Sequence, residues 1–174
     1  MLNIFRKRLS KGVVTRPLAG AGQVLPEGVE VLGEELKKEI YKKFGRSFHI
    51  REVDTGSCGG CESEIIATTN PIYDIQRFGI DFVASPRHAD ALLVTGPVSK
   101  NMVLALKKTY DAMPDPKFVI TLGDCALNGG LFKDSYYTAK GANNVVPVAM
   151  HIPGCPPDPA LIIRHILAFL HQYK

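Results

Sequence analysis

From Phe48 onwards, short apolar segments rich in β-branched residues alternate with helical ones, and this alternation constrains the fold more than any other feature. The expected strands cover residues 48–53, 80–84, 89–95, 117–122 and 144–151. The expected helices cover residues 62–69, 99–112 (with Ser99 as N-cap) and 159–173 (with Asp158 as N-cap). The pattern predicts an α/β fold with a flavodoxin-like, doubly wound, mostly parallel sheet and helices on both faces.

Residues 1–47 precede this pattern, and we expect them to form an N-terminal extension. A helix is predicted over residues 33–44, because Leu36, Ile40 and Phe44 form a narrow apolar stripe at helical spacing. Residues 1–12 mix apolar and basic side chains, which is typical either of an amphipathic helix on a membrane surface or partner, or of a solvated terminus. We therefore divide the chain into a helical extension 1–47 that docks on partners and an α/β domain 48–174.

Composition excludes several classes of protein. The net charge is only +4, and the basic residues are not interleaved with aromatic ones, so nucleic-acid binding is not expected. No apolar run reaches the roughly 18 residues of a membrane span, and the N-terminus lacks the apolar core of a secretory signal, so we expect a cytoplasmic location. Four cysteines in 174 residues are too few for a disulfide scaffold. In a reducing compartment they point to metal binding or redox chemistry.

The placement of the cysteines is more informative than their number. Cys58 and Cys61 form a CxxC pair after the first expected strand, Cys125 follows the strand at 117–122, and Cys155 follows the last strand. Because the carboxyl ends of parallel strands meet at one edge of a sheet, the four thiols are expected to converge there. The glycines around them would let backbone N–H groups approach an anionic cluster closely.

Four interpretations of this constellation stay open on residue chemistry alone. An iron–sulfur cluster uses all four thiols. A zinc site would use them too, but structural zinc usually staples small folds with two close pairs. A thioredoxin-like CxxC pair leaves Cys125 and Cys155 idle. The last interpretation is that these cysteines simply belong to the core.

Several ungapped stretches resemble one known family. They are residues 56–64 (GSCGGCESE), 70–79 (NPIYDIQRFG), 85–98 (SPRHADALLVTGPV), 114–117 (PDPK) and 152–157 (IPGCPP). The chain resembles the small subunit of membrane-bound, energy-converting [NiFe]-hydrogenase-type complexes, which form one superfamily with the 20 kDa subunit of respiratory complex I. In the complex I subunit the first two cysteines are adjacent, whereas Gly59 and Gly60 separate Cys58 from Cys61 here, as in the hydrogenase branch.

The resemblance implies one [4Fe–4S] cluster held by Cys58, Cys61, Cys125 and Cys155. It implies an oxidoreductase subunit that is not catalytic alone and passes electrons between a ferredoxin-like iron–sulfur subunit and a hydrogenase-like large subunit. Membrane-embedded subunits of the same complex would hold it, peripherally, on the cytoplasmic side of the cell membrane. Related complexes reduce sulfur compounds or quinone, and the same relay role there is the alternative.

A few polar residues near the expected site have two interpretations each. Glu62 and Glu64 could carry protons near the cluster, or could stabilise a helix start by their negative charge. Arg87 and His88 could contact a cluster or the large subunit, or could cap a loop. We expect His151 to pack at a strand end. We also expect Asp124, beside Cys125, to face away or to be neutralised, because an unpaired carboxylate there would make a cluster harder to reduce.

Overall fold

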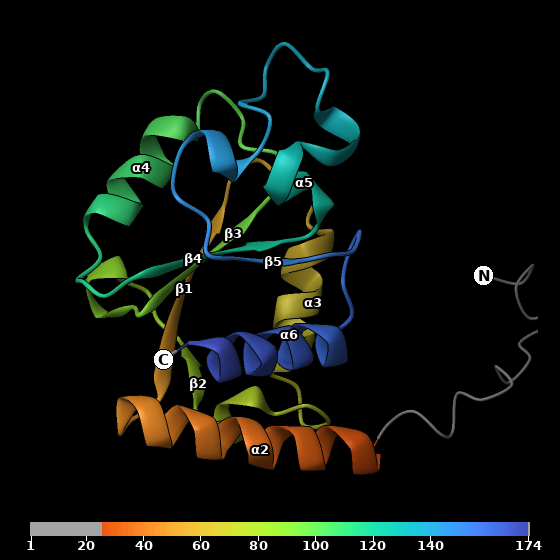
Figure 1. The fold of residues 1–174 in the computed structure, drawn as a ribbon. Helices are drawn as coiled ribbons and strands as arrows, with labels where there is room; N and C mark the ends of the chain where they lie inside the picture. The colour runs from red at the N-terminus through yellow and green to blue at the C-terminus, as the bar shows by residue number, and fades with distance from the viewer. Residues whose placement is uncertain (1–25, 174) are drawn as a thin grey trace, which may run out of the picture.

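A computed structural model describes residues 26–173 and shows a five-stranded sheet in which every pairing is parallel. The strands are β1 (Phe48–Asp54), β2 (Ile80–Phe82), β3 (Ala91–Thr95), β4 (Phe118–Leu122) and β5 (Met150–Ile152). The helices are α2 (Pro26–Phe44), α3 (Gly60–Thr68), α4 (Val103–Asp111), α5 (Asp124–Asn128) and α6 (Pro159–Gln172). Short 3₁₀ turns are η1 (Ile75–Phe78), η2 (Pro86–His88), η3 (Gly130–Phe132) and η4 (Ala142–Asn144). Figure 1 shows their arrangement.

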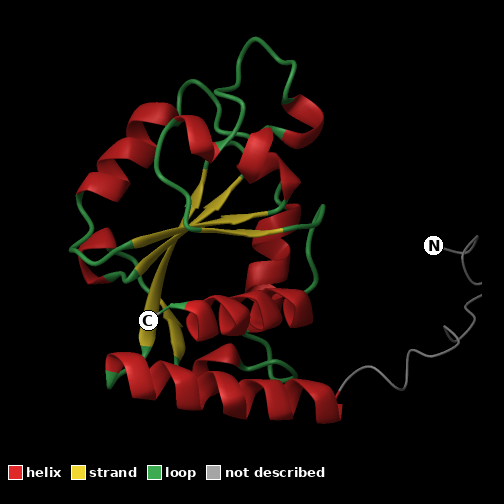
Figure 2. Ribbon diagram, in the orientation of Figure 1, coloured by secondary structure: helices red, strands yellow, loops and turns green. Residues whose placement is uncertain are grey.

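The strand order β2-β1-β3-β4-β5 is the flavodoxin-like order, so the predicted fold class is confirmed. The sheet separates two hydrophobic cores. On one face Ile50, Leu93 and Ile120 pack with side chains of α2, α3 and α6, and on the other Val94 and Val119 pack with α4. Figure 2 shows the sheet between these layers. Consecutive residues of β3 face opposite cores, and all five of its residues are buried, which explains its continuous apolar sequence.

The N-terminal helix α2 begins at Pro26, well before the predicted start at Gly33. Gly33 lies inside the helix because α2 packs closely on η1: a Cβ at Gly33 would lie 2.2 Å from a ring carbon of Phe78. Leu36 and Ile40 are fully buried, and α2 packs against α6, at the bottom of Figure 1. The apolar stripe thus packs on its own domain. The segment 1–12 lies outside the described residues.

Two other predicted boundaries were wrong. Strand β5 has only three residues, because the segment before it forms η4. In that turn the Asn144 amide donates to Ala139 O and Lys140 O. Pro147, which follows, has no N–H to donate to a neighbouring strand. Helix α4 starts at Val103, because Ser99 pairs with Thr138 in an isolated bridge instead of capping a helix. The N-cap of α6 is confirmed: Asp158 Oδ1 accepts from Leu161 N at 2.9 Å.

Candidate functional site

The loops that follow β1, β4 and β5 bring all four cysteines to the wall of one cavity. The cavity has a volume of about 70 Å³ and is lined by Cys58, Cys61, Cys125 and Cys155, together with Gly96 and Pro97 after β3. It lies at the carboxyl edge of the sheet. The strand order reverses between β1 and β3, which is where ligands bind in open α/β sheets. The thiols that are far apart in the sequence therefore share one site, as their placement predicted.

Two glycines leave room that the sulfur atoms use. A Cβ at Gly123 would lie 2.7 Å from Cys61 Sγ, and a Cβ at Gly130 would lie 2.9 Å from Cys125 Sγ. Both glycines also have positive φ (+82° and +48°), which other residues rarely adopt. The sequence around Cys125 therefore needs glycine both for the turn of the backbone and for the space beside the thiols.

Hydrogen bonds tie the loop of Cys125 to the loop of Cys155. Gly123 N donates to Ile152 O, and Asp124 N donates to Gly154 O, each at 2.9 Å. Asp124 Oδ1 accepts in return from Gly154 N at 3.1 Å. The Asp124 carboxylate is thus partly compensated by a backbone N–H, with His151 Nε2 3.9 Å away. His151, expected at a strand end, is instead the middle residue of β5; it is half-buried, and its Nδ1 lies 3.0 Å from Thr121 Oγ1.

Burial keeps the inner thiols protonated in the absence of a cation. Cys61 is half-buried, and burial, followed by the charges of Glu62 and of the other three cysteines, raises its pKa to about 12. Burial also raises the pKa of Cys125. A hydrogen bond from the backbone of Leu131 partly offsets this effect, and the charges of Cys155, Cys58 and Asp124 add to it. These mutual effects follow from the closeness of the thiols, and a cationic iron or zinc centre would reverse them.

Glu62 and Glu64 lie at the start of α3, behind Cys61. Neither carboxylate oxygen of Glu62 has a hydrogen-bond partner among the described residues, although both atoms are buried. Sequence reasoning missed Glu52 on β1, which is half-buried and whose pKa is raised by burial and then by the charge of Glu62. Its Oε1 lies 3.5 Å from Thr95 Oγ1. Phe48, Ile50 and Glu52 share one face of β1, and a carboxylate where this alternation calls for an apolar side chain was the signal that could have identified it.

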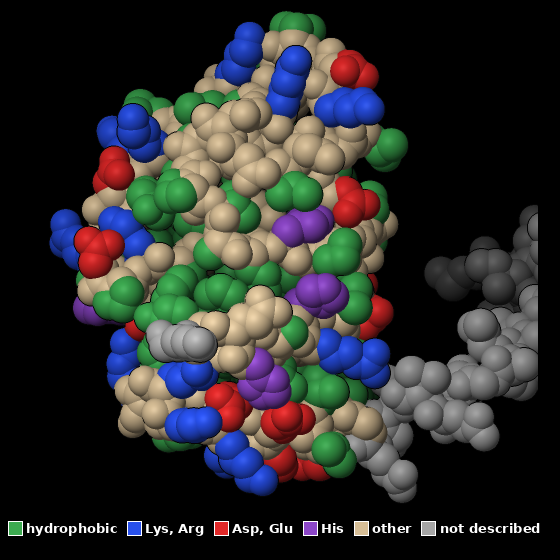
Figure 3. All heavy atoms as spheres, viewed as in Figure 1, with side chains coloured by type: hydrophobic (Ala, Val, Ile, Leu, Met, Phe, Trp, Pro, Cys, Tyr) green, Lys and Arg blue, Asp and Glu red, His purple; other side chains and the backbone are tan. Residues whose placement is uncertain are grey.

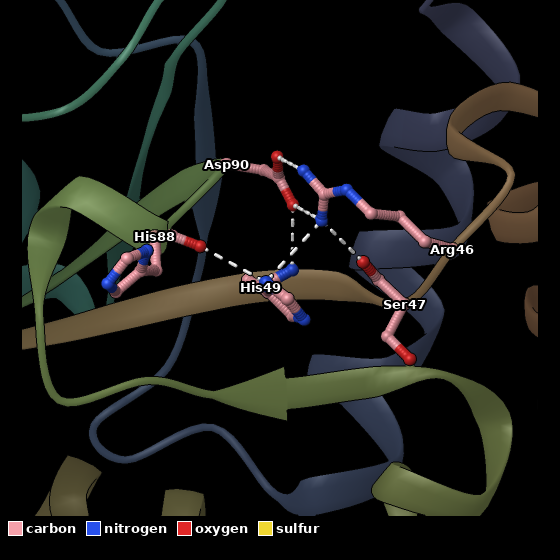
Figure 4. A network of polar contacts seen from close by, with 5 residues as sticks. All are labelled: Arg46, Ser47, His49, His88 and Asp90. Atoms are coloured by element: carbon pink, nitrogen blue, oxygen red, sulfur yellow. Dashed lines mark hydrogen bonds and ion pairs between the residues drawn. The ribbon is translucent and has the colours of Figure 1, made fainter.

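Arg87 and His88 lie at the opposite edge of the sheet, in η2 before β3, so they do not join the cysteine cavity. The local network there centres on Asp90 (Figure 4). Its carboxylate accepts from Arg46 Nη1 at 2.9 Å, from Arg46 Nη2 at 2.6 Å and from His49 N at 2.9 Å. The guanidinium pKa of Arg46 is raised, chiefly by this hydrogen bond. Ser85 Oγ accepts from Arg87 N, which fits the interpretation of this segment as a capped loop.

Two features are absent from the part of the chain that the structure describes. Within residues 26–173, no three His, Cys, Asp or Glu side chains lie close enough together to hold a metal ion. A single tetrahedral zinc would need its sulfur ligands about 3.8 Å apart, from Zn–S bonds of about 2.3 Å. No helix within the same residues is long and apolar enough to cross a membrane.

Comparison with known proteins identifies the family. Formate hydrogenlyase subunit 7 of Escherichia coli is 44% identical over 144 residues, which is 83% of this chain and 56% of that protein. The probable membrane-bound hydrogenase subunit mbhJ of Pyrococcus furiosus is 43% identical over 134 residues, covering 77% of this chain and 80% of that one. Among solved structures, a chain of the membrane-bound sulfane sulfur reductase, an archaeal respiratory membrane complex, matches with a TM-score of 0.65 and 34% identity, covering 80% of this chain and 75% of that chain.

These relatives agree with the resemblance seen in the motifs. The chain spans little more than half the length of the formate hydrogenlyase subunit, but four-fifths of the Pyrococcus subunit. The family model for the 20 kDa subunit of NADH ubiquinone oxidoreductase matches residues 58–169, a stretch that begins at the first cysteine and contains all four. The chain therefore belongs to the family of the 20 kDa subunit of NADH ubiquinone oxidoreductase, within which it is similar to subunits of hydrogenase-type membrane complexes.

Proposed function

We propose that this chain binds one [4Fe–4S] cluster through Cys58, Cys61, Cys125 and Cys155. The observation that carries the proposal is that these four cysteines, from three loops, line one cavity at the carboxyl edge of the sheet. Such a cluster supplies one-electron redox chemistry when it is bound. The residues present fit it: four thiols line one cavity, no three of them among the described residues lie close enough together for a single ion, and glycines leave space beside the sulfur atoms of Cys61 and Cys125.

The chain's own residues would set the properties of that site. The four cysteines must lose their protons to bind iron, so loading would release protons, among them those of Cys61 and Cys125, whose pKa is raised chiefly by burial. The two hydrogen bonds between Asp124 and Gly154 would hold the loops of Cys125 and Cys155 at a fixed separation. Four glycines and two prolines are among the thirteen residues that line the cavity, and glycine would let backbone N–H groups approach a cluster closely.

The role we propose is relay of electrons between a ferredoxin-like subunit and a hydrogenase-like large subunit. Support comes from relatives that are named as subunits of formate hydrogenlyase and of a membrane-bound hydrogenase. We place the chain peripherally on the cytoplasmic side of the membrane, held there by membrane-embedded subunits. The extension 1–47 would contact these partners, and on α2 the exposed side chains of Val31 and Tyr41 are available for this. The likeness to a sulfane sulfur reductase chain favours a second candidate, the same relay in a complex that reduces sulfur compounds.

A kinetic test separates a relay from a structural module. In the complex purified without oxygen, electrons from a reduced ferredoxin should reach the large subunit at the wild-type rate only when all four cysteines are present. In the variant Cys125→Ser the neighbouring subunits should remain bound, while electron transfer falls by at least a hundredfold. Unchanged transfer in this variant would contradict the relay. A colourless wild-type protein that contains zinc instead of iron would contradict the cluster itself.

A further inference from the structure

Threonine supplies the polar residues that are fully buried in the part of the chain that the structure describes. Thr55, Thr68, Thr95 and Thr121 are each 0% exposed, whereas charged side chains lie at the surface, as Figure 3 shows for one face. A buried hydroxyl needs hydrogen-bond partners, because burying one without them is costly. Thr55 follows β1 directly, and its hydroxyl has its partners at the end of β3 and on the loop after it. Thr55 therefore joins two loops at the carboxyl edge of the sheet.

The Thr55 hydroxyl acts as a donor and as an acceptor at once. Its Oγ1 donates to Thr95 O at 2.5 Å and accepts from Val98 N at 3.1 Å. The main chain of Thr55 adds two more bonds: its N–H donates to Thr95 O at 3.0 Å, and its carbonyl accepts from Ser99 N at 2.8 Å. Valine has nearly the same shape as threonine but would leave the Val98 N–H without this acceptor, whereas serine would keep both bonds of the hydroxyl.

Val98 has a backbone conformation that needs support from its surroundings. Its φ is +56°, in the left-handed region that β-branched residues rarely adopt. Its side chain is fully buried in the core beside α4, and its carbonyl accepts from Ala139 N at 2.7 Å. Residues strained in this way persist only where several contacts hold them, and they are frequent at functional sites. The Thr55 hydroxyl is one of the contacts that hold Val98.

Residues 96–98, which we call the β3 turn, lie against the loop of the first two cysteines. A Cβ at Gly96 would lie 2.7 Å from Ser57 N, so the two backbones approach each other as closely as glycine allows. Gly96 and Pro97 also line the cavity together with Ser57 and Cys58. The position of the β3 turn therefore determines where the CxxC loop lies at the wall of the cavity.

The β3 turn also reaches α5, the helix that carries the third cysteine. Gly141 N donates to Pro97 O at 3.3 Å, and a Cβ at Gly141 would lie 2.2 Å from Leu127 O in α5. The hydrogen bonds between Asp124 and Gly154 tie α5 in turn to the loop of the fourth cysteine. Backbone contacts thus run continuously through all three cysteine loops, and the β3 turn is the connection to the CxxC loop.

We propose that Thr55 is a positioning residue for the cluster: its hydroxyl holds Val98 in the left-handed conformation and so fixes the CxxC loop relative to Cys125 and Cys155. The proposal rests on the proposed function, since a cluster is retained only while all four thiols stay in place. A shift of the CxxC loop would also move N–H groups relative to the sulfur atoms, and hydrogen bonds to the sulfurs are among the factors that set the reduction potential of a cluster.

Three substitutions in the full chain, purified without oxygen, separate positioning from stability. Thr55→Val removes the hydroxyl and Thr55→Ser keeps it. Thr68→Val is the matched control, because it removes an equally buried hydroxyl that bonds within its own helix, to Ile65 O at 2.6 Å. A chelator should remove iron from Thr55→Val about tenfold faster than from the wild type, and the EPR spectrum and reduction potential of the cluster should change. Thr55→Ser and Thr68→Val should resemble the wild type in all three measurements.

Amide hydrogen exchange tests the role of the hydroxyl without relying on a cluster. The Val98 N–H should exchange about tenfold faster in Thr55→Val, because it loses its acceptor, and should stay protected in Thr55→Ser and Thr68→Val. Unchanged exchange in Thr55→Val, or iron loss that is equally fast in Thr68→Val, would overturn the proposal. A wild-type chain without iron would instead overturn the proposed function, and the exchange of Val98 would still decide whether Thr55 holds the β3 turn.

Discussion

The amino and carboxyl edges of the sheet are built from the same five strands, but their polar groups are paired differently. At the amino edge, Asp90 joins Arg46 and the backbone of His49 in three hydrogen bonds, and opposite charges meet. At the carboxyl edge, four thiols line one cavity, the pKa values of Cys61 and Cys125 are raised, and the two carboxylate oxygens of Glu62 are unpaired among the described residues. At the amino edge the charged groups are paired with one another. At the carboxyl edge the thiols and carboxylates are arranged for a cationic centre that would compensate their negative charges.

This difference shows where stability and function lie in the molecule. Changes at the amino edge should lower the free energy of unfolding and leave the cluster site intact. Changes at the carboxyl edge should abolish or weaken the cluster with little effect on the fold, because both faces of the sheet are packed by separate hydrophobic cores.

The largest effect is expected from Cys155→Ala. The side chain is exposed, so its removal should change the free energy of unfolding by no more than about 0.5 kcal/mol. Cluster content, measured as iron and acid-labile sulfide, should fall to near zero because one ligand is lost. Pro153→Ala, an exposed change in the same loop, is the control and should keep the cluster. A full complement of iron in Cys155→Ala would mean that Cys155 is not a ligand.

The next largest effect is expected from Asp90→Ala at the other edge. The Asp90 side chain is only 12% exposed, and its loss leaves the His49 N–H and the Arg46 guanidinium without their acceptor. The free energy of unfolding should fall by about 2–3 kcal/mol in urea titrations. The exposed pair Arg77–Glu30 is the control, and Arg77→Ala should cost only about 0.5 kcal/mol. The division between the edges would be wrong if Asp90→Ala removed the cluster while stability was kept.

A smaller effect is expected from Gly123→Ala. The new Cβ would meet Cys61 Sγ at 2.7 Å, and a residue at φ +82° is strained, so stability should fall by about 1–2 kcal/mol and cluster content should drop. Gly45→Ala is a matched control, because Gly45 also has positive φ but nothing lies within 4 Å of an added Cβ. It should show the loss of stability without the loss of cluster. Equal cluster content in both variants would contradict the account of Gly123.

The smallest effect is a pH dependence of the cluster-free chain. An unfolded cysteine ionises near pH 8.5, whereas the pKa of folded Cys61 is about 12, so above pH 8.5 the folded state binds more protons than the unfolded state. Stability should therefore decrease as pH rises from 8.5 towards 12. The decrease should be about 1 kcal/mol by pH 10, less than full burial would give because the half-exposed thiol is screened by water. Urea titrations of Cys61→Ser should show a weaker slope, and an identical slope would assign the effect elsewhere.

The sequence was sufficient for the fold class and for the convergence of the cysteines. Both follow from one rule, that strands alternating with helices form a parallel sheet whose carboxyl ends share an edge. Helix starts were less predictable where tertiary contacts decide them. Gly33 looks like a helix boundary but allows α2 to pack on Phe78, and Ser99 looks like an N-cap but pairs with Thr138.

The surroundings of the cysteines show the same limit. The hydrogen bonds between Asp124 and Gly154 join residues that lie thirty positions apart, and no local sequence pattern predicts them. Likewise the charges of Glu52 and Glu62 interact only because β1 lies beside α3 in the folded chain. Which loops are tied to each other depends on the packing of the sheet, and so on contacts that a single sequence does not show.

The most direct test of the central claim is the metal content of the wild-type chain, produced and purified without oxygen. Iron, zinc and acid-labile sulfide are measured per chain together with the EPR spectrum of the reduced protein. We predict about four iron and about four sulfide, no zinc, and the signal of a single reduced cluster. One zinc per chain with neither iron nor sulfide would contradict the account, and so would a cluster that persists when Cys125 or Cys155 is replaced.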